Sequence, residues 1–431
     1  MVGSSRKSSV RASLVSTAQT RANNSGQGRR HSPDYWLLIL TALLLTIGLV
    51  VVYSISPGLA ASQHISQSYF ITKQMLAVGL GLVTFALAAF IPLSLWRKLA
   101  TPLVVISIIG CLVVMVTPIN ATYPAHRWIR LGGFSFQIAE LIKLALLVWL
   151  ANFLAAKYRA GEVANFNSVT KPLLIILLVM GFVVAKLQSD FGSAAVIVAI
   201  MGVMAYAVGV PLKRIAMIGA LVVILAILAI SSTAYRRERL ATFLHPESNC
   251  QSTGYQACQA LISVGSGGIF GKGLGYSVQA YGHLPEASND SIFAIIAEEF
   301  GFVGTVAILV IYAVFITRLK QVVEHSANQF SRLLIVGVMA WLSTQMIINV
   351  GAMVGLLPLK GITLPLISQG GTSLIFLTAA LGMVFHISRY TSYNAVTPEE
   401  VIQKRGDAGY SLERRRVRRA HNPSLVARPR S

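Results

Sequence analysis

The sequence predicts an all-α membrane protein, a polytopic bundle of about ten transmembrane helices with a long extracytoplasmic loop between helices 7 and 8. Of its 431 residues, 55% are hydrophobic and only 12% are charged, whereas soluble domains carry about 25% charged residues. The apolar residues are gathered into runs of about 20, the length that crosses a hydrocarbon core of about 30 Å. In lipid each run must be helical, because its backbone groups have no water to bond.

Ten apolar runs follow one another along the chain. The expected spans are residues 36–56, 70–92, 96–117, 137–156, 172–187, 191–210, 212–231, 291–317, 333–354 and 363–387. The fifth and sixth are separate because one helix over 172–210 would be about 58 Å long, twice what a bilayer needs. The polar string from Lys186 to Gly192 marks the expected break.

Basic residues are distributed unevenly among the loops. With ten spans both termini lie on one side, and that side holds 26 of the 36 Lys and Arg residues. Since cytoplasmic segments are enriched in Lys and Arg, we expect a multi-pass protein of the cell (plasma) membrane with both termini cytoplasmic. The net charge of +21 then reflects topology and attraction to anionic membrane lipids. No nucleic-acid partner is expected.

The expected domains are a tail over 1–34, a transmembrane domain over 35–390 and a second tail over 391–431. Both tails are basic and lack apolar periodicity, so we expect them to be disordered and cytoplasmic. The extracytoplasmic loop is expected to cover residues 232–290. Its cysteines, Cys250 and Cys258, are compatible either with a disulfide or with two unpaired thiols.

Polar residues in or beside the spans are candidates for function, because burying a charge in lipid is costly. Glu140 and Lys143 are three residues apart and can meet on one helix face. They form either a structural ion pair or a site in which Lys143 holds a phosphate oxygen. Arg127 can make planar, bidentate contacts to a phosphate. Gln188 and Asp190 mark the break between two spans, where Asp190 can equally cap the next helix.

The long loop ends in a glycine-rich and acidic sequence. Residues 265–275 can bring backbone amides close to an anion, although such a string is weak evidence alone. Glu286 and Asp290 lie just before the eighth span, where Asp290 either acts as a general base at a cavity mouth or caps the helix. Glu298 and Glu299 are adjacent in that span, so we expect one to face a wet interior and the other to make structural hydrogen bonds.

Four separated blocks together resemble the SEDS family of bacterial shape, elongation, division and sporulation proteins. They are Arg127–Ile129 with Gln137–Lys143, then Gln188–Ser193, then Gly254–Gln256 with Leu284–Glu286 and Asp290–Ala294, and finally Asn349–Ser373. The resemblance covers about residues 35–390. The sequence departs from the family pattern at Ile138 and Ser189, where prolines are usual, and at Ser288, Asn289, Ser291 and Gln369. Within the family, it is more similar to division members than to elongation members.

The resemblance implies a peptidoglycan glycosyltransferase that polymerises lipid II, an undecaprenyl diphosphate carrying a disaccharide-pentapeptide, onto a growing glycan strand. The family's catalytic carboxylate maps to Asp290, as a base or as ligand of a divalent cation such as Mg or Mn. Arg127 and Lys143 are then expected to steady the diphosphate, with Glu140 orienting Lys143. The remaining expected substrate-binding residues are Gln188, Asp190, Glu286, Lys360, Ser368, Gly370 and Gly371.

The resemblance also implies partners, namely a class B penicillin-binding protein transpeptidase and other division proteins, at the division septum. Three alternatives stay open. A lipid II flippase would move the substrate without making a glycosidic bond, and a RodA-like polymerase would serve cell elongation. A non-catalytic scaffold would use its tails to recruit division proteins.

Overall fold

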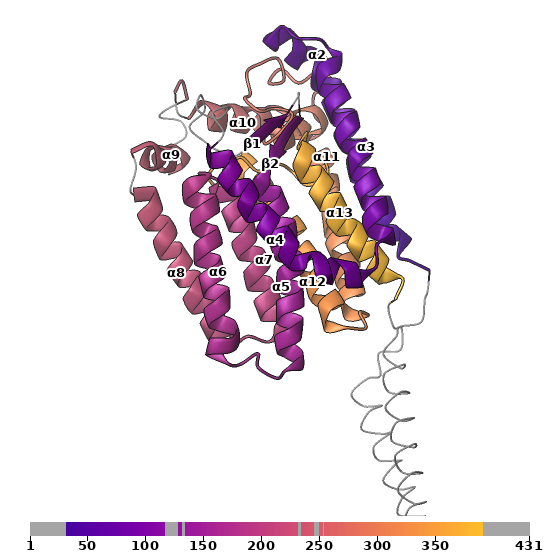
Figure 1. Cartoon of the computed structure of the whole chain (residues 1–431). Helices are drawn as coiled ribbons and strands as arrows, with labels where there is room; N and C mark the ends of the chain where they lie inside the picture. Colours follow the sequence, from indigo (N-terminus) through magenta and orange to yellow (C-terminus); the bar gives the residue numbers. More distant parts are fainter. Residues whose placement is uncertain are drawn as a thin grey trace, which may run out of the picture. The chain divides into compact units, whose positions relative to one another are not determined.

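The computed structural model of the chain describes residues 32–116, 128–131, 134–231, 234–244, 250–252 and 254–390. Over these residues it is a helical bundle with one two-stranded sheet at one end (Figure 1). The expected tails lie outside the described residues, apart from 32–34. An all-α membrane fold is therefore confirmed, with one small addition.

The chain begins with three long helices, α2 (Tyr35–Gln63), α3 (Ser68–Phe90) and α4 (Leu93–Val116). Asp34 caps α2, since its side chain accepts a hydrogen bond from the backbone N–H of Trp36 at 3.0 Å. The helix α2 continues through Pro57 and past the end of the predicted span. These helices confirm the first three predicted spans.

The addition is a short antiparallel hairpin before the fourth span. Strand β1 (Trp128–Leu131) pairs with β2 (Phe134–Gln137), so that Trp128 stands opposite Gln137. Strand β2 leads directly into α5 (Ile138–Arg159). A hairpin was not predicted here, because four residues are the shortest stretch over which strand alternation can be recognised and Trp128–Leu131 does not alternate.

The predicted break between the fifth and sixth spans is confirmed. The fifth span consists of the π-helical turn η2 (Phe166–Thr170), α6 (Lys171–Gly181) and a second π-helical turn η3 (Phe182–Leu187), and the sixth is α7 (Phe191–Val208). Gln188, Ser189 and Asp190 separate the two, and Ser189 has a positive φ of 55°. The sharp change of direction falls inside the polar string that the sequence singled out.

The next segment contains the seventh predicted span and part of the long loop. Its helices are α8 (Leu212–Ser231), α9 (Ala234–Leu244) and α10 (Tyr255–Ser266). The loop predicted over 232–290 is therefore partly helical. Cys250 and Cys258 form a disulfide, which decides between the two alternatives for these cysteines.

Three helices complete the bundle, α11 (Ile292–Glu324), α12 (Gln329–Met353) and α13 (Gly371–Ser388). Helix α11 changes direction at Gly301, whose φ of 66° and ψ of −163° lie outside the helical region. The predicted start of the last span at residue 363 is wrong, because the helix begins at Gly371. Pro365 lies in the intervening stretch, where its ring disfavours helical backbone at the preceding residue.

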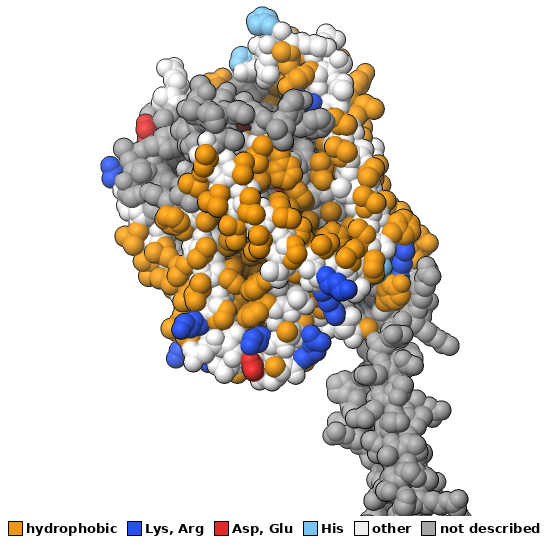
Figure 2. All heavy atoms as spheres, viewed as in Figure 1, with side chains coloured by type: hydrophobic (Ala, Val, Ile, Leu, Met, Phe, Trp, Pro, Cys, Tyr) orange, Lys and Arg blue, Asp and Glu red, His pale blue; other side chains and the backbone are white. Residues whose placement is uncertain are grey.

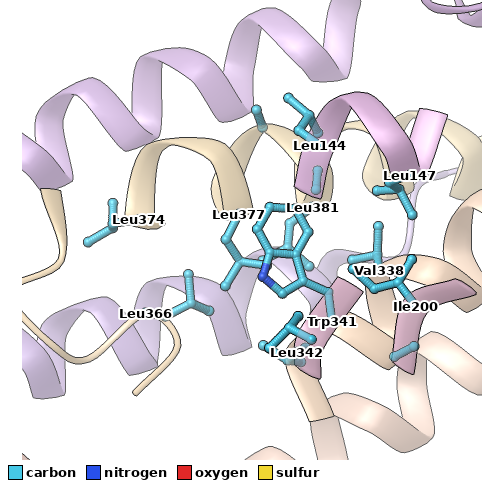
Figure 3. Packing of buried hydrophobic residues seen from close by; sticks show 14 of the residues in the cluster. Leu144, Leu147, Ile200, Val338, Trp341, Leu342, Leu366, Leu374, Leu377 and Leu381 are labelled. Atoms are coloured by element: carbon cyan, nitrogen blue, oxygen red, sulfur yellow. The ribbon is translucent and has the colours of Figure 1, made fainter. Parts of the chain in front are cut away.

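Helices α5 and α13 occupy the centre of the bundle. In each, 83% of the most apolar stretch is buried, against 22% for α4. Helix α13 packs along α3, while α5 contacts α4, α7 and α12. Figure 3 shows Trp341 of α12 between leucines of these helices, including Leu144 and Leu377. Helices α5 and α13 are therefore the most deeply buried of the helices compared here.

Both ends of the transmembrane domain lie at one end of the bundle. The backbone N–H of Asp34 donates to Ser388 Oγ at 3.1 Å, and the rings of Tyr35 and Phe385 are 6.3 Å apart. Nine helices within the described ranges are long and apolar enough to cross a membrane. Helix α8, at the predicted seventh position, has 20 residues and is not among these nine. Figure 2 shows a broad hydrophobic band with Lys and Arg side chains gathered below it.

Candidate functional site

Glu140 and Lys143 form a buried ion pair in the first turns of α5. Lys143 Nζ lies 2.7 Å from Glu140 Oε1, and the two side chains are 1% and 4% exposed. The predicted meeting of these side chains on one helix face is confirmed. The other carboxylate oxygen of Glu140, Oε2, is buried and has no hydrogen-bond partner among the residues that the structure describes. Because an unpaired buried oxygen is costly, this atom can accept a hydrogen bond from a bound molecule.

Gln345 of α12 connects this ion pair to the segment that precedes α13. Its Oε1 accepts hydrogen bonds from Lys143 Nζ at 3.4 Å and from Trp341 Nε1 at 2.7 Å. Its Nε2 lies 3.1 Å from both the carbonyl and the hydroxyl of Thr363, and 3.2 Å from Ser373 Oγ. One amide group thus fixes the lysine relative to a non-helical stretch of backbone.

Asp290 lies at the end of the long loop and is half-buried. Ser291, and not Asp290, occupies the N-cap position of α11, which disfavours the helix-capping interpretation of Asp290. Asn349 of α12 donates from Nδ2 to the carbonyls of Asp290 and Ile362, both at 2.7 Å. The loop end, α12 and the segment before α13 therefore meet at Asp290.

Glu286 shapes the turn that leads to Asp290. It has a positive φ of 53°, which is uncommon for a residue other than glycine. Its carbonyl accepts from the backbone N–H groups of Asn289 and Ser291, at 2.9 and 3.1 Å. Its exposed carboxylate accepts from Asn289 Nδ2 at 2.6 Å. The predicted substrate-binding residue Glu286 therefore has a clear structural role in this turn.

Asp190 caps α7 and also fastens the hairpin to it. Its carboxylate accepts from the backbone N–H and the hydroxyl of Ser193, at 3.0 and 2.8 Å, which confirms the capping interpretation. It also accepts from Gln137 Nε2 at 3.0 Å. The backbone N–H of Gln137 in turn donates to Thr372 Oγ1 at 3.3 Å. Asp190 is only 2% exposed. Its contacts join α7 to the hairpin, and Gln137 joins the hairpin to α13.

Gln188 lies on the other side of the same break. Its Nε2 donates to Cys111 Sγ of α4 at 3.3 Å, and the side chain is 1% exposed. Lys360 lies near the start of α7, with Nζ 5.4 Å from the centre of the Phe191 ring. A Cβ atom added to Gly192 would lie 2.5 Å from Ile362 Cγ1, so the segment carrying Lys360 packs tightly against α7.

The backbone between α12 and α13 is held by side chains from several helices. Ser368 Oγ, which is buried, accepts from the backbone N–H of Leu364 at 2.7 Å. Tyr312 of α11 donates its hydroxyl to the carbonyl of Pro365. Gln369 donates from its backbone to Ser288 at 2.9 Å and from Nε2 to Phe70 of α3 at 2.7 Å. Irregular backbone at membrane depth requires such internal partners.

Gly370 and Gly371 end this segment, and their surroundings differ. A Cβ atom added to Gly370 would lie 2.9 Å from Thr363 Cγ2, so a larger residue would displace the partner of Gln345. A Cβ atom at Gly371 would meet nothing within 4 Å. Of these two positions, only Gly370 requires a glycine, because its backbone lies close to the side chain of Thr363.

Glu298 and Glu299 both make structural contacts, so the expectation that one faces a wet interior is wrong. The two residues are 0% and 1% exposed. Glu298 pairs with Lys272 Nζ at 2.6 Å and accepts from Ser277 Oγ at 2.6 Å. Glu299 accepts from the backbone N–H of Gly275 at 2.8 Å. A backbone amide of the glycine-rich string, that of Gly275, thus contacts an anion as predicted. The anion is the carboxylate of Glu299 and not a bound ligand.

Arg127 lies outside the described residues. Glu140 and Lys143 form one centre, the ion pair of α5, and Glu286 and Asp290 form another at the end of the long loop. Gln188 and Lys360 lie elsewhere, against Cys111 and Phe191. The sequence analysis gave no role to Gln345 or to Asn349, which connect the two centres through Thr363 and Ile362. The available signal was two amides four residues apart within an apolar span, on one helix face.

The residue types present do not favour a protein-built metal site. Over the described ranges, no group of three or more His, Cys, Asp or Glu side chains is arranged to hold a metal ion. Divalent cations such as Mg²⁺ are usually held by one or two carboxylates together with substrate phosphates. The cation that the resemblance implies would therefore be held by Asp290 together with the phosphates of a bound substrate, and not by a cluster of protein ligands.

Comparison with known proteins places this geometry in context. The Cell cycle protein family of FtsW, RodA and SpoVE matches residues 35–393. The probable peptidoglycan glycosyltransferase FtsW of Saccharophagus degradans is 36% identical over 362 residues, covering 82% of this chain and 92% of the relative. Stage V sporulation protein E of Bacillus subtilis is 33% identical, covering 85% of this chain and 99% of its own.

Solved structures give the same result for the fold. RodA, the rod shape determining protein of Thermus thermophilus, is 28% identical with a TM-score of 0.59, over 83% of this chain and 97% of its own. A chain from a study of how a peptidoglycan synthase complex coordinates polymerization and crosslinking is 27% identical with a TM-score of 0.67. That match covers 83% of this chain and 98% of the other.

Proposed function

Because the chain belongs to the FtsW, RodA and SpoVE family of cell cycle proteins, we propose that it is a peptidoglycan glycosyltransferase that polymerises lipid II. In the proposed reaction a sugar hydroxyl of one substrate attacks the anomeric carbon of the other. The bond from that carbon to the diphosphate breaks, and undecaprenyl diphosphate leaves. This chemistry needs a base for the hydroxyl proton and cations for the developing negative charge.

The observation that carries the proposal is a continuous set of contacts between a buried cation and the acidic loop end. Lys143 contacts Gln345, which contacts Thr363. The neighbouring Ile362 shares the amide of Asn349 with Asp290. We assign Asp290 as the base that takes the hydroxyl proton, and Lys143 as a cation that steadies the leaving diphosphate.

The other predicted site residues receive supporting roles in this proposal. Arg127 is a second cation for the diphosphate, and Glu140 orients Lys143 through their ion pair at 2.7 Å. The substrate cavity is proposed to be lined by Gln188, Asp190, Glu286, Lys360, Ser368, Gly370 and Gly371. Of these, Asp190 caps α7 and contacts Gln137, and Ser368 fixes the turn that begins at Leu364, so their substitution would act mainly through the shape of the cavity.

The proposed cellular role is supported by the similarity to known relatives. Similarity to proteins named FtsW favours a septal role in cell division, with RodA-like elongation as the alternative. The solved peptidoglycan synthase complex supports a class B penicillin-binding protein as partner for crosslinking. The distribution of Lys and Arg supports cytoplasmic termini, and we propose accordingly that the long loop and Asp290 lie on the outer side of the cell membrane.

The test is incubation of the purified full-length protein with labelled lipid II in detergent, where sidedness is abolished. A polymerase forms glycan chains that are resolved by gel electrophoresis. A flippase, or a scaffold acting only through its tails, forms none under these conditions. Absence of polymer from protein that binds lipid II would overturn the proposal.

A further inference from the structure

A cavity of about 120 Å³ lies between α6, α7 and α8, away from the site described above. It is lined by Thr170, Leu173, Leu177, Val198, Met201, Gly202, Ala205, Val210, Ile215, Ile218, Gly219 and Val222. Thr170 is the one lining residue with a polar side chain. The cavity therefore suits a hydrocarbon chain and not a sugar or a diphosphate.

The cavity is remote from the start of α7, where Asp190 and Lys360 lie. Met201 and Ala205 are 10 and 14 residues beyond Phe191, the first residue of that helix. At 1.5 Å per residue they lie about 15 and 21 Å along its axis. An occupant of the cavity is consequently distinct from the polar end of the proposed substrate.

Helix α8 places the cavity at the edge of the bundle. Several of its apolar side chains are exposed, among them Met217 at 64% and Leu228 at 60%. In a bilayer these side chains contact lipid. A lipid chain can therefore reach the cavity from the surrounding membrane.

Basic residues surround the end of the cavity at which α6 and α8 begin. Lys171 follows Thr170 directly, and Lys213 lies between the lining residues Val210 and Ile215; both lysines are exposed. Arg214 donates from Nη1 to the carbonyl of Ala164 at 2.7 Å, which fixes its guanidinium beside the rim. The rim thus carries three positive charges.

The nearby acid does not neutralise this rim. Glu162 pairs with Lys157 at 2.8 Å. Hydrogen bonds from Lys157 and Ser168 lower the pKa of the Glu162 carboxyl, so that this carboxyl stays ionised and neutralises Lys157. Lys171 and Lys213 therefore remain as positive charges at the boundary where phospholipid headgroups lie.

We propose that this cavity and its basic rim bind one anionic phospholipid from the leaflet at the end of the bundle where the termini lie. An acyl chain fills the apolar cavity, and the headgroup phosphate contacts Lys171 and Lys213. Basic pockets between transmembrane helices are a recurring form of anionic lipid site. The proposal is independent of the glycosyltransferase activity.

The structure offers variants that test the two halves of the site separately. Lys171→Gln with Lys213→Gln removes the charge of the rim. Gly202→Leu with Gly219→Leu fills the cavity, since a Cβ atom at either glycine meets nothing within 4 Å. Gly79→Leu in α3 is the matched control, because its Cβ atom also meets nothing within 4 Å and Gly79 is not among the lining residues. Leucine favours helix over glycine, so these variants should fold.

The experiment is native mass spectrometry of the purified full-length protein titrated with phosphatidylglycerol, with phosphatidylethanolamine as the neutral comparison. We expect one phosphatidylglycerol to bind selectively. Binding should weaken about 30-fold in the lysine variant, fall to background in the filled variant and persist in Gly79→Leu. Equal binding of both lipids, or unchanged binding by the filled variant, would overturn the proposal.

Discussion

The side-chain amide of Asn349 lies 2.7 Å from the backbone carbonyl of Asp290. The same amide nitrogen lies 2.7 Å from the carbonyl of Ile362. A single side chain on α12 therefore sets the position of the proposed base relative to the segment that carries Lys360 and Ser368. Because Asn349 is only 2% exposed, no water can readily replace it.

Asn349→Leu should reduce polymerisation by about 100-fold while the protein still binds lipid II, because a displacement of about 1 Å at a reacting group costs this much. Two carbonyls lose their partner, so the free energy of unfolding should fall by about 2 kcal/mol. Polymer yield and thermal unfolding measure the two effects. Ser343→Ala is the control, since Ser343 bonds only to carbonyls of its own helix. Normal polymerisation by Asn349→Leu would exclude this positioning role.

The ion pair of α5 can be separated into a structural and a functional contribution. Lys143→Met leaves the Glu140 carboxylate buried without its cation, and should lower the free energy of unfolding by about 3–5 kcal/mol. Adding Glu140→Leu removes the unpaired charge and should restore most of that stability. If Lys143 steadies the diphosphate, the double variant should fold and remain inactive in the lipid II assay. A stable double variant that polymerises at the normal rate would leave the pair with a structural role alone.

The glycine-rich part of the long loop should detach from α11 when Glu298 is replaced. Glu298→Ala removes the partner of Lys272 and of Ser277. We expect faster trypsin cleavage after Lys272 and faster amide hydrogen exchange over residues 265–279, because a loop without anchors opens more often. Glu238→Ala, at an exposed position in α9, should change neither. Equal protection of the loop in both variants would contradict this account.

The disulfide between Cys250 and Cys258 predicts a thiol count. The chain has three cysteines, of which Cys111 is free and buried in α4. Protein purified without reductant and then denatured should react with one equivalent of an alkylating reagent, and with three after reduction. Three equivalents without reduction would show that the disulfide does not form, and would weigh against a loop in an oxidising compartment.

Local sequence was sufficient for much of the fold. The spans follow from the length of apolar runs. The break near Gln188 follows because one helix over residues 172–210 would be about 58 Å long, and the polar string marks its place. The contact between Glu140 and Lys143 follows from a spacing of three on one helix. In each case the sequence pattern and the structural feature that it predicts lie in the same short stretch of chain.

Contacts between distant segments could not be predicted in this way. Gln345 and Asn349 gain their roles from Thr363 and Asp290, which come from other parts of the chain. Glu298 is satisfied by loop amides about 20 residues earlier in the chain. The late start of α13 depends on hydrogen bonds from α3, α11 and α12 to the preceding backbone, which compensate for the missing helix.

The central claim is that Asp290 takes the proton of the attacking hydroxyl, and replacing its carboxylate tests this most directly. Purified Asp290→Asn and Asp290→Ala should bind labelled lipid II as the unaltered protein does, and should form no glycan polymer in detergent. Polymer formation by either variant at the rate of the unaltered protein would contradict the assignment.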